Sequence, residues 1–262
     1  MIMTNTAANF LFEKKHRLFL NFVAHTDQVI NSINYLRNQI SEFASKSDKE
    51  LPFNYLDVGC GYGDKTQAII KTINHHARVN TVALDPSSVL LSIFAKDGVG
   101  EDIDLICSNW EDYEPNRKFN LITSIHAFYY IDNWEVAIRK MKNNLLKNGK
   151  ICVALRSNDS VCKFRNHFYP KIHGYDKLER ISDELCELLN RNGFKYNLDY
   201  VPSILDIRDC LAANEKGIQL IEFILRHPYE DISDNIKREI HEYLETNNEQ
   251  GYLSQNDGYV WI

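Results

Sequence analysis

Short apolar runs recur along the chain between longer stretches in which apolar residues return every three or four positions. The runs are continuous and of strand length, which is typical of parallel strands covered on both faces. They predict strands at 55–58, 79–84, 102–107, 119–125 and 151–155. The amphipathic stretches between them predict helices, so the pattern indicates an α/β fold with a mostly parallel sheet.

The chain on either side of these strands is mainly helical in pattern. We expect helices at 10–25, 29–40, 157–167, 181–192, 210–225 and 236–244. We also expect a loop that holds Tyr169 and Pro170, and a glycine stop at Gly149 before the fifth strand. A sixth strand within 195–207 is ended or interrupted near Pro202. A last strand at 252–262 is expected to be antiparallel beside it, which completes a seven-stranded sheet.

A glycine-rich turn follows the first strand. The segment 54–66 reads Asn-Tyr-Leu-Asp-Val-Gly-Cys-Gly-Tyr-Gly-Asp-Lys-Thr, which predicts a strand, a tight turn and the start of a helix. Glycine lets the backbone turn sharply and approach a ligand closely, at the strand's carboxyl end and over the helix N-terminus. Asp85 ends the next strand, where an acid can accept both ribose hydroxyls of an adenosine. A plain turn and a strand-end acid are the alternative. The Gly-Lys-Ser/Thr ending of a phosphate-binding P-loop is lacking.

Composition narrows the class of protein. With 262 residues, 44% of them hydrophobic, the chain suits one α/β domain with an appended subdomain. The formal net charge of −6 argues against a nucleic-acid partner, which needs a basic surface. The six cysteines are scattered without metal-ligand spacing, so we expect free thiols and no metal. No secretory signal or membrane-length apolar stretch is seen, and the cytoplasm is the expected location.

The motif 56–63, Leu-Asp-Val-Gly-Cys-Gly-Tyr-Gly, resembles the first motif of class I S-adenosylmethionine-dependent methyltransferases. Asp85-Pro86-Ser87 resembles the acidic end of their second strand. The resemblance implies a Rossmann-like fold and an S-adenosylmethionine site with Asp85 on the ribose. Asn109 and Trp110, after the third strand, are candidates to bond to or stack on adenine, with a solvent-facing loop and a packed Trp as the alternative. The expected cofactor-binding residues are Asp57, Gly59, Cys60, Gly61, Gly63, Asp85, Pro86, Ser87, Asn109, Trp110 and Ile125.

Later segments resemble the histamine N-methyltransferase family. They are 125–131 after the fourth strand, 204–217 near the sixth, and 252–260 at the end of the chain. The family's substrate-contacting acid falls near Asp27 and its C-terminal Asn near Asn256, while its Gln after the fourth strand is His126 here. The resemblance implies Asp27, His126 and Asn256 as substrate-binding residues. From the chemistry of methyl transfer we expect His126 to be the catalytic residue, and Tyr129 and Tyr130 to bind the substrate as an aromatic wall for a planar or cationic ring. A capping role for Asp27 and a structurally bonded His126 are the alternatives.

These resemblances assign roles to three consecutive segments. Residues 1–50 form part of a substrate lid, 51–207 the cofactor-binding core, and 208–262 a substrate-side helical segment with the terminal strand. The expected activity is methylation of a small molecule, on an imidazole or amine nitrogen. An O- or carboxyl-methyltransferase and a non-catalytic cofactor-binding sensor are the alternatives. The expected partner is a small-molecule methyl acceptor, with no nucleic acid or membrane, in a monomer or weak homodimer.

Overall fold

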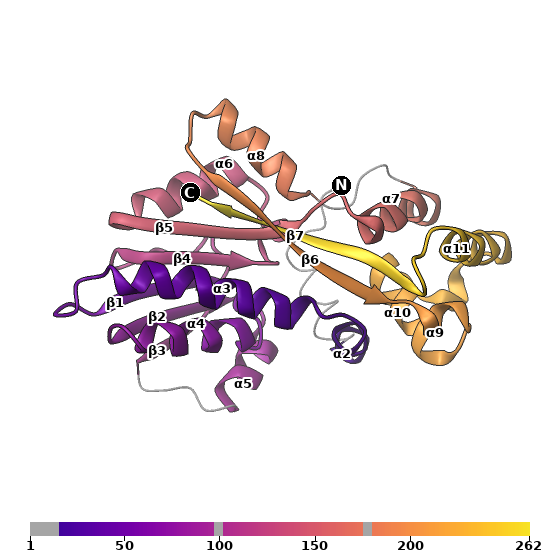
Figure 1. Ribbon diagram of the computed structural model, residues 1–262, viewed down its shortest axis with the longest axis horizontal. Helices are drawn as coiled ribbons and strands as arrows, with labels where there is room; N and C mark the ends of the chain where they lie inside the picture. The colour runs from indigo at the N-terminus through magenta and orange to yellow at the C-terminus, as the bar shows by residue number, and fades with distance from the viewer. Residues whose placement is uncertain (1–15, 97–101, 175–179) are drawn as a thin grey trace. The chain divides into compact units, whose positions relative to one another are not determined.

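A seven-stranded sheet runs through the computed structural model, which describes residues 16–96, 102–174 and 180–262. Its strand order is β3-β2-β1-β4-β5-β7-β6 (Figure 1). The strands are β1 Phe53–Val58, β2 Val79–Asp85, β3 Ile103–Cys107, β4 Phe119–Ile125, β5 Leu145–Arg156, β6 Asn197–Asp206 and β7 Tyr252–Trp261. The order reverses between β1 and β4, which is the point where open α/β sheets bind their ligands.

The sheet is mostly parallel. β1 pairs in parallel with β2 and β4, β2 with β3, and β4 with β5. Ile151 of β5 and Ile262, just after β7, exchange two backbone hydrogen bonds of 3.1 and 3.0 Å, the pattern of an antiparallel pair. The expected seven-stranded, mostly parallel sheet is therefore confirmed.

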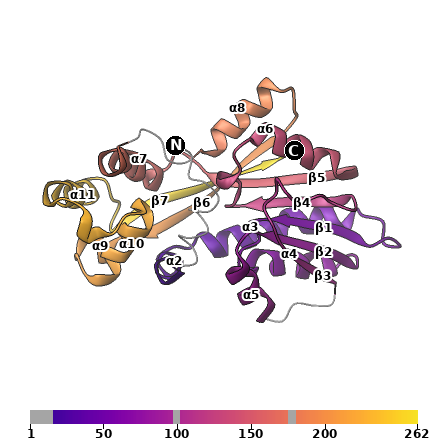
Figure 2. The same ribbon diagram turned by 180° about the vertical axis from the view of Figure 1, so that it is seen from behind.

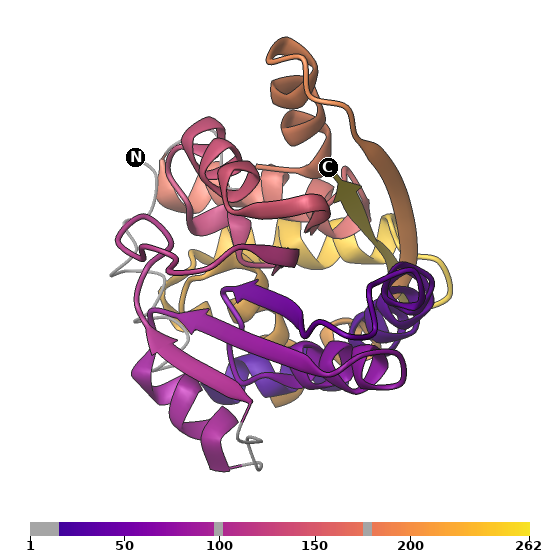
Figure 3. The same cartoon turned by 90° about the vertical axis from the view of Figure 1, so that its left-hand side faces the viewer.

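Helices cover both faces of the parallel strands. Figures 1 and 2 show α6 and α8 on one side of the sheet and α4 and α5 on the other, and Figure 3 views these strands from their ends. The described helices are α2 His16–Ala24, α3 Gln28–Ser45, α4 Asp64–Asn74, α5 Ser88–Lys96, α6 Trp134–Asn143, α7 Ser160–His173, α8 Ser182–Arg191, α9 Arg208–Leu211, α10 Glu215–Leu225 and α11 Asp234–Thr246. Two 3₁₀ turns are η1 Phe128–Tyr130 and η2 Tyr229–Asp231. None of these helices is both long and apolar enough to cross a bilayer.

The chain divides into two compact units, each with its own core. The first unit takes the described parts of Met1–Asn31, Arg156–Ile181 and Tyr200–Asp257, and its core includes Phe164, Phe168 and Leu220. The second takes those of Ser32–Leu155, Ser182–Asp199 and Gly258–Ile262, with core residues such as Leu56, Ile138 and Leu189. The three consecutive segments expected from the sequence stay a prediction about functional roles.

The expected glycine stop at Gly149 is wrong. Helix α6 ends earlier, and Asn144 follows it with a carbonyl oxygen that accepts the Phe119 backbone N–H at 2.8 Å. This bond starts β5 directly after the helix. Asn148 then adopts a left-handed φ of 65°, and the register of β5 against β4 shifts there. Gly149 lies inside β5, where an added Cβ would come within 2.9 Å of the Phe119 carbonyl oxygen.

Two prolines lie inside elements that were expected to stop at them. Helix α7 continues past Pro170 for one more turn, and Gly174 caps the helix with φ 75°. Strand β6 continues through Pro202 because it is the edge strand of the sheet, where a missing N–H is tolerated. The Asn31 side-chain amide donates to the Pro202 carbonyl oxygen at 3.1 Å.

The stretch expected as one helix at 210–225 is two helices. The chain turns at Ala213, with φ 50°, between α9 and α10. The Asn214 side chain caps α10 by accepting the Gly217 backbone N–H at 3.0 Å. The first expected helix begins at residue 16 within the described chain, and its expected start at 10–15 lies outside the described residues.

Candidate active site

The glycine turn joins β1 to α4 at the carboxyl edge of the sheet. Gly59 and Gly63 have φ of 82° and 87°, and each is also closely packed. A Cβ on Gly59 would come within 2.1 Å of the Ala127 Cβ, and one on Gly63 within 2.4 Å of the Phe94 ring. Around Gly61, with φ 58°, nothing described lies within 4 Å of an added Cβ. The turn is thus fixed at both ends and open at its centre, where a ligand can approach the backbone.

Asp85 lies beside this open centre. Its Oδ2 accepts the Gly61 backbone N–H at 2.8 Å, and its Oδ1 accepts the Ser87 N–H at 2.9 Å. Burial raises the pKa of the carboxyl group, and the two N–H groups oppose that shift. The Ser87 hydroxyl caps α5 through the Leu90 N–H at 3.3 Å, and Pro86 joins the strand end to this cap. The acid is therefore held against the turn.

Asp57 ties the turn to two neighbouring elements. One carboxylate oxygen accepts the Thr66 hydroxyl of α4 at 2.6 Å, and the other accepts the Thr123 hydroxyl of β4 at 2.7 Å. The Tyr55 hydroxyl bonds to Thr123 at 2.8 Å. Burial raises the pKa of Asp57 and the hydroxyl groups lower it. These contacts support a role for Asp57 in fixing the turn, and any contact with a cofactor stays a prediction.

The other expected cofactor residues have different surroundings. Trp110 is 3% exposed within the second unit's core, with the Lys140 ammonium 4.9 Å from its ring centre. This burial favours the packed-Trp interpretation over stacking on adenine. Asn109 is half-buried, and its Oδ1 has no hydrogen-bond partner among the described residues, which leaves an acceptor for an amino group. Cys60 and Ile125 are buried beside the turn and at the end of β4, and burial raises the pKa of the Cys60 thiol.

The segment after β4 packs against the glycine turn. His126 has a left-handed φ of 57°, uncommon for a residue with a side chain, and its N–H donates to the Ala154 carbonyl oxygen at 3.0 Å. Its ring Nδ1 is 3.3 Å from the Tyr129 hydroxyl, and the two rings are stacked. Tyr130 follows at a right angle to Tyr129. Since Ala127 touches Gly59, this aromatic segment is adjacent to the turn.

Asp27 and Asn256 belong to the first unit. Asp27 Oδ1 accepts the Ile204 backbone N–H at 2.8 Å, and within the described chain its second carboxylate oxygen makes no hydrogen bond. Asn256 donates its backbone N–H to Asp159 at 2.7 Å and accepts the Ser157 N–H at 2.9 Å. No described group bonds to its side-chain amide. Whether these residues meet His126, as the sequence predicts, stays a prediction.

Sequence reasoning missed a buried polar network beside these two residues. Thr26 and Gln28 bond to Gln255 and Asp257 of β7, each at 2.9 Å. Gln255 and Asp257 are two residues apart in β7 and so lie on one face of the strand, a signal that the sequence carries once the two segments are known to be neighbours. The Asp209 contact with His25, at 3.0 Å, was also missed, because no local pattern joins residues so far apart in the chain.

A protein-family model described as a methyltransferase domain matches residues 24–198. The chain belongs to the methyltransferase domain family. The match covers the glycine turn, Asp85 and the segment after β4, which are the parts that the geometry brings together. The matched part of the chain is a methyltransferase domain, and S-adenosylmethionine is the cofactor that the glycine turn and Asp85 lead us to expect.

Individual relatives of the methyltransferase differ in their acceptors. Malonyl-[acyl-carrier protein] O-methyltransferase 1 of Ilyobacter polytropus is 26% identical over 163 residues, 60% of this chain and 58% of that relative. Histamine N-methyltransferase of Danio rerio is 22% identical over 214 residues, 73% of each chain. The crystal structure of the plantazolicin methyltransferase BpumL with a pentazolic desmethylPZN analog and SAH has a TM-score of 0.55. Its identity is 15%, and the likeness covers 96% of this chain and 93% of that one.

The residues at the turn fit the cofactor. The open space over Gly61 accommodates a ligand at the backbone, and Asn109 Oδ1 is an acceptor without a partner among the described residues. Each Asp85 oxygen uses one described contact and has a second lone pair for a ribose hydroxyl. When bound, S-adenosylmethionine supplies an electrophilic methyl group. The protein's own contribution is to hold the reactants in line and exclude water.

Proposed function

We propose that this methyltransferase methylates a nitrogen of a small molecule that carries an imidazole or an amine. The observation that supports this is the packing of the His126 segment against the glycine turn. His126, whose ring Nδ1 lies beside the Tyr129 hydroxyl, belongs to the segment adjacent to the glycine turn, where we expect the cofactor. The aromatic rings of Tyr129 and Tyr130 suit a planar or cationic acceptor.

The proposed roles follow from the chemistry of nitrogen nucleophiles. A neutral imidazole nitrogen carries its lone pair near pH 7, whereas an aliphatic amine must first lose a proton. His126 orients the acceptor nitrogen or takes this proton. Asp27 anchors a cationic group through the carboxylate oxygen that Ile204 does not use. Asn256 contributes its side-chain amide, because Asp159 and Ser157 engage only its backbone.

A second candidate is methylation of a carboxyl or hydroxyl oxygen. The malonyl-[acyl-carrier protein] O-methyltransferase relatives, 26% and 29% identical, favour it. An ionised carboxylate is already nucleophilic and needs no base. Its negative charge would be repelled by the Asp27 carboxylate, which is the reason that we place this candidate second.

The deciding experiment measures methyl transfer from labelled S-adenosylmethionine to matched amines, imidazoles, carboxylic acids and phenols. We expect turnover with an imidazole or amine and none with the acids. Preference for carboxylic acids or phenols would select the second candidate and contradict the first.

Kinetics of four variants at three positions then test the acceptor residues. His126→Ala should lower kcat while leaving cofactor affinity unchanged, and His126→Gln should shift preference toward histamine. Asp27→Asn and Asn256→Ala should raise KM for the acceptor. Wild-type kinetics in all three positions would exclude them from the acceptor site.

A further inference from the structure

The segment 25–28, which carries Asp27, is attached to the edge strand β6. Thr26 forms an antiparallel bridge with Leu205, and its hydroxyl lies 2.9 Å from the Ile204 carbonyl oxygen. The Asp206 backbone N–H donates to the His25 carbonyl oxygen at 2.8 Å. Together with the bond from the Ile204 N–H to Asp27, these contacts fix the direction of the Asp27 side chain.

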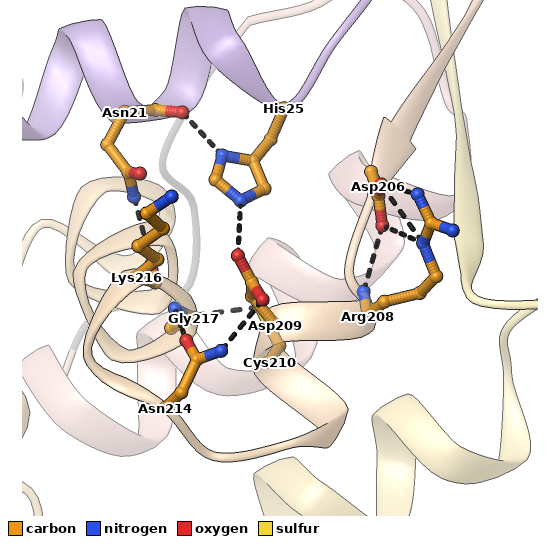
Figure 4. Close-up of polar contacts among 9 residues, drawn as sticks. All are labelled: Asn21, His25, Asp206, Arg208, Asp209, Cys210, Asn214, Lys216 and Gly217. Atoms are coloured by element: carbon orange, nitrogen blue, oxygen red, sulfur yellow. Dashed lines mark hydrogen bonds and ion pairs between the residues drawn. The ribbon is translucent and has the colours of Figure 1, made fainter.

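His25 links this segment to two helices of the first unit (Figure 4). Its ring Nδ1 is 2.7 Å from the Asn21 carbonyl oxygen in α2, and its Nε2 is 3.0 Å from Asp209 Oδ2 in α9. A carbonyl oxygen and an ionised carboxylate both only accept hydrogen bonds. Only the imidazolium, which carries a proton on each ring nitrogen, can donate to both at once.

The surrounding groups hold Asp209 in its ionised form and in position. The Asn214 amide donates to Asp209 Oδ1 at 2.7 Å, and hydrogen bonds from Asn214 and then from His25 lower the pKa of Asp209. Gly217 of α10 lets the helices approach closely, because an added Cβ would come within 2.2 Å of the Asp209 backbone. The other charges near this pair are Asp206, Arg208 and Lys216, and Asp206 is itself paired with Arg208 (Figure 4).

We propose that His25 is a positioning residue for the methyl acceptor: its imidazolium, held between Asn21 and Asp209, fixes the segment 25–28 and so orients Asp27. The proposal rests on the proposed role of Asp27 in acceptor binding.

Amide hydrogen exchange tests the attachment without an acceptor. In His25→Asn the side-chain amide nitrogen can donate to the Asn21 carbonyl oxygen in place of Nδ1, but the hydrogen bond to Asp209 is lost. We expect the hydrogen-exchange protection of the Ile204 and Asp206 amides to fall about tenfold. Arg17→Gln is the matched control, because it removes an exposed ion pair with Glu215 between α2 and α10 but not the His25 contacts. Unchanged protection in His25→Asn would overturn the proposal.

A pair of substitutions at Asp209 separates this role from simple packing. In Asp209→Asn the new amide group can still bond to His25 Nε2 while its oxygen still accepts from Asn214, whereas Asp209→Leu keeps the bulk and removes both bonds. We expect the protection of the Ile204 amide to be kept in Asp209→Asn and to fall in Asp209→Leu. Equal protection in the two variants would contradict the proposal.

Kinetics distinguish failure of the proposal from failure of the proposed function. With histamine as the first probe, His25→Asn should raise KM about tenfold and leave kcat and cofactor affinity unchanged. If Asp27→Asn raises KM and His25→Asn does not, the positioning role is wrong while the acceptor role of Asp27 stands. If neither changes KM, the acceptor role of Asp27 is wrong, and the exchange profiles still decide whether His25 fixes the segment.

Discussion

At the scale of single residues, Asp85 shows how a ligand-binding acid is prepared before its ligand arrives. Burial disfavours its charge and raises its pKa, and two backbone N–H groups, from Gly61 and Ser87, offset part of this effect. The same bonds fix the direction of the carboxylate. The conformational entropy of this side chain is therefore lost on folding rather than on ligand binding.

We predict that Asp85→Ala weakens binding of S-adenosylmethionine by about 1.5–3 kcal/mol, the usual effect of losing hydrogen bonds to a charged group. Titration calorimetry measures this directly. Asp104→Ala is the matched control, because Asp104 is an exposed acid on the neighbouring strand β3 that pairs with Arg117. Asp85→Asn should fall between the wild type and Asp85→Ala, since one acceptor oxygen remains. Unchanged affinity in Asp85→Ala would refute the ribose assignment.

Placements that depend on neighbours close in sequence could be predicted. The glycine turn and Asp85 each belong to a local strand-end pattern, and the structure brings them into contact. The surroundings of Trp110 could not be predicted in the same way, because it packs in a core with residues of α6 that lie further along the chain. His25 and Asp209 carry no local signal, since their contact depends on how α2 and α9 pack.

At the scale of elements, strand and helix positions follow the hydrophobic pattern, and their ends depend on tertiary contacts. Strand β6 runs through Pro202 because it lies at the edge of the sheet, a position that the sequence of the strand does not reveal. Asn144 ends α6 because its carbonyl oxygen is taken by Phe119 of β4. In both cases the predicted end came from a local stop signal, Pro or Gly. The observed end depends on where the strand lies in the sheet and on its neighbouring strand.

The cap of α7 gives a prediction about pH and stability. Asp159 accepts the Cys162 and Asn256 backbone N–H groups, each at 2.7 Å, and burial raises its pKa from 3.8 to about 6 despite the opposing charge of Arg156. The folded state thus binds more protons than the unfolded state between these two pKa values. The contribution of Asp159 to stability is full below about pH 4 and is lost as pH rises through about 6.

Asp159→Asn should remove this dependence. Relative to the variant, the wild type should lose up to about 3 kcal/mol of unfolding free energy between pH 4 and 7, from about 1.36 kcal/mol for each pKa unit. Denaturant unfolding at several pH values measures the difference. Asp206→Asn is the control of opposite sign, because Arg208 lowers the pKa of Asp206. If the difference in unfolding free energy between the wild type and Asp159→Asn is constant with pH, burial does not shift the pKa of Asp159.

At the scale of the whole molecule, the sequence predicts the sheet better than the division into units. The parallel strands are consecutive in the chain, so their hydrophobic pattern reveals them one after another. The two units are each assembled from three separated stretches, and α3, β5, β6 and β7 contribute residues to both. Such a division depends on which distant stretches pack together, and local patterns do not contain that information.

Net charge is a property of the whole chain that can be read directly from the sequence. From this charge we predict no appreciable binding to duplex DNA or RNA at physiological salt. The chain carries a formal charge of −6, and nucleic-acid binding draws most of its free energy from Lys and Arg side chains that displace counterions from phosphates. Several described arginines, Arg78, Arg117 and Arg208 among them, are paired with acids. A mobility-shift assay at about 0.05 and 0.2 M salt measures this, since phosphate-driven binding weakens steeply over that range. Tight binding that weakens in this way would identify a nucleic acid as the partner and would contradict the prediction of a small-molecule acceptor.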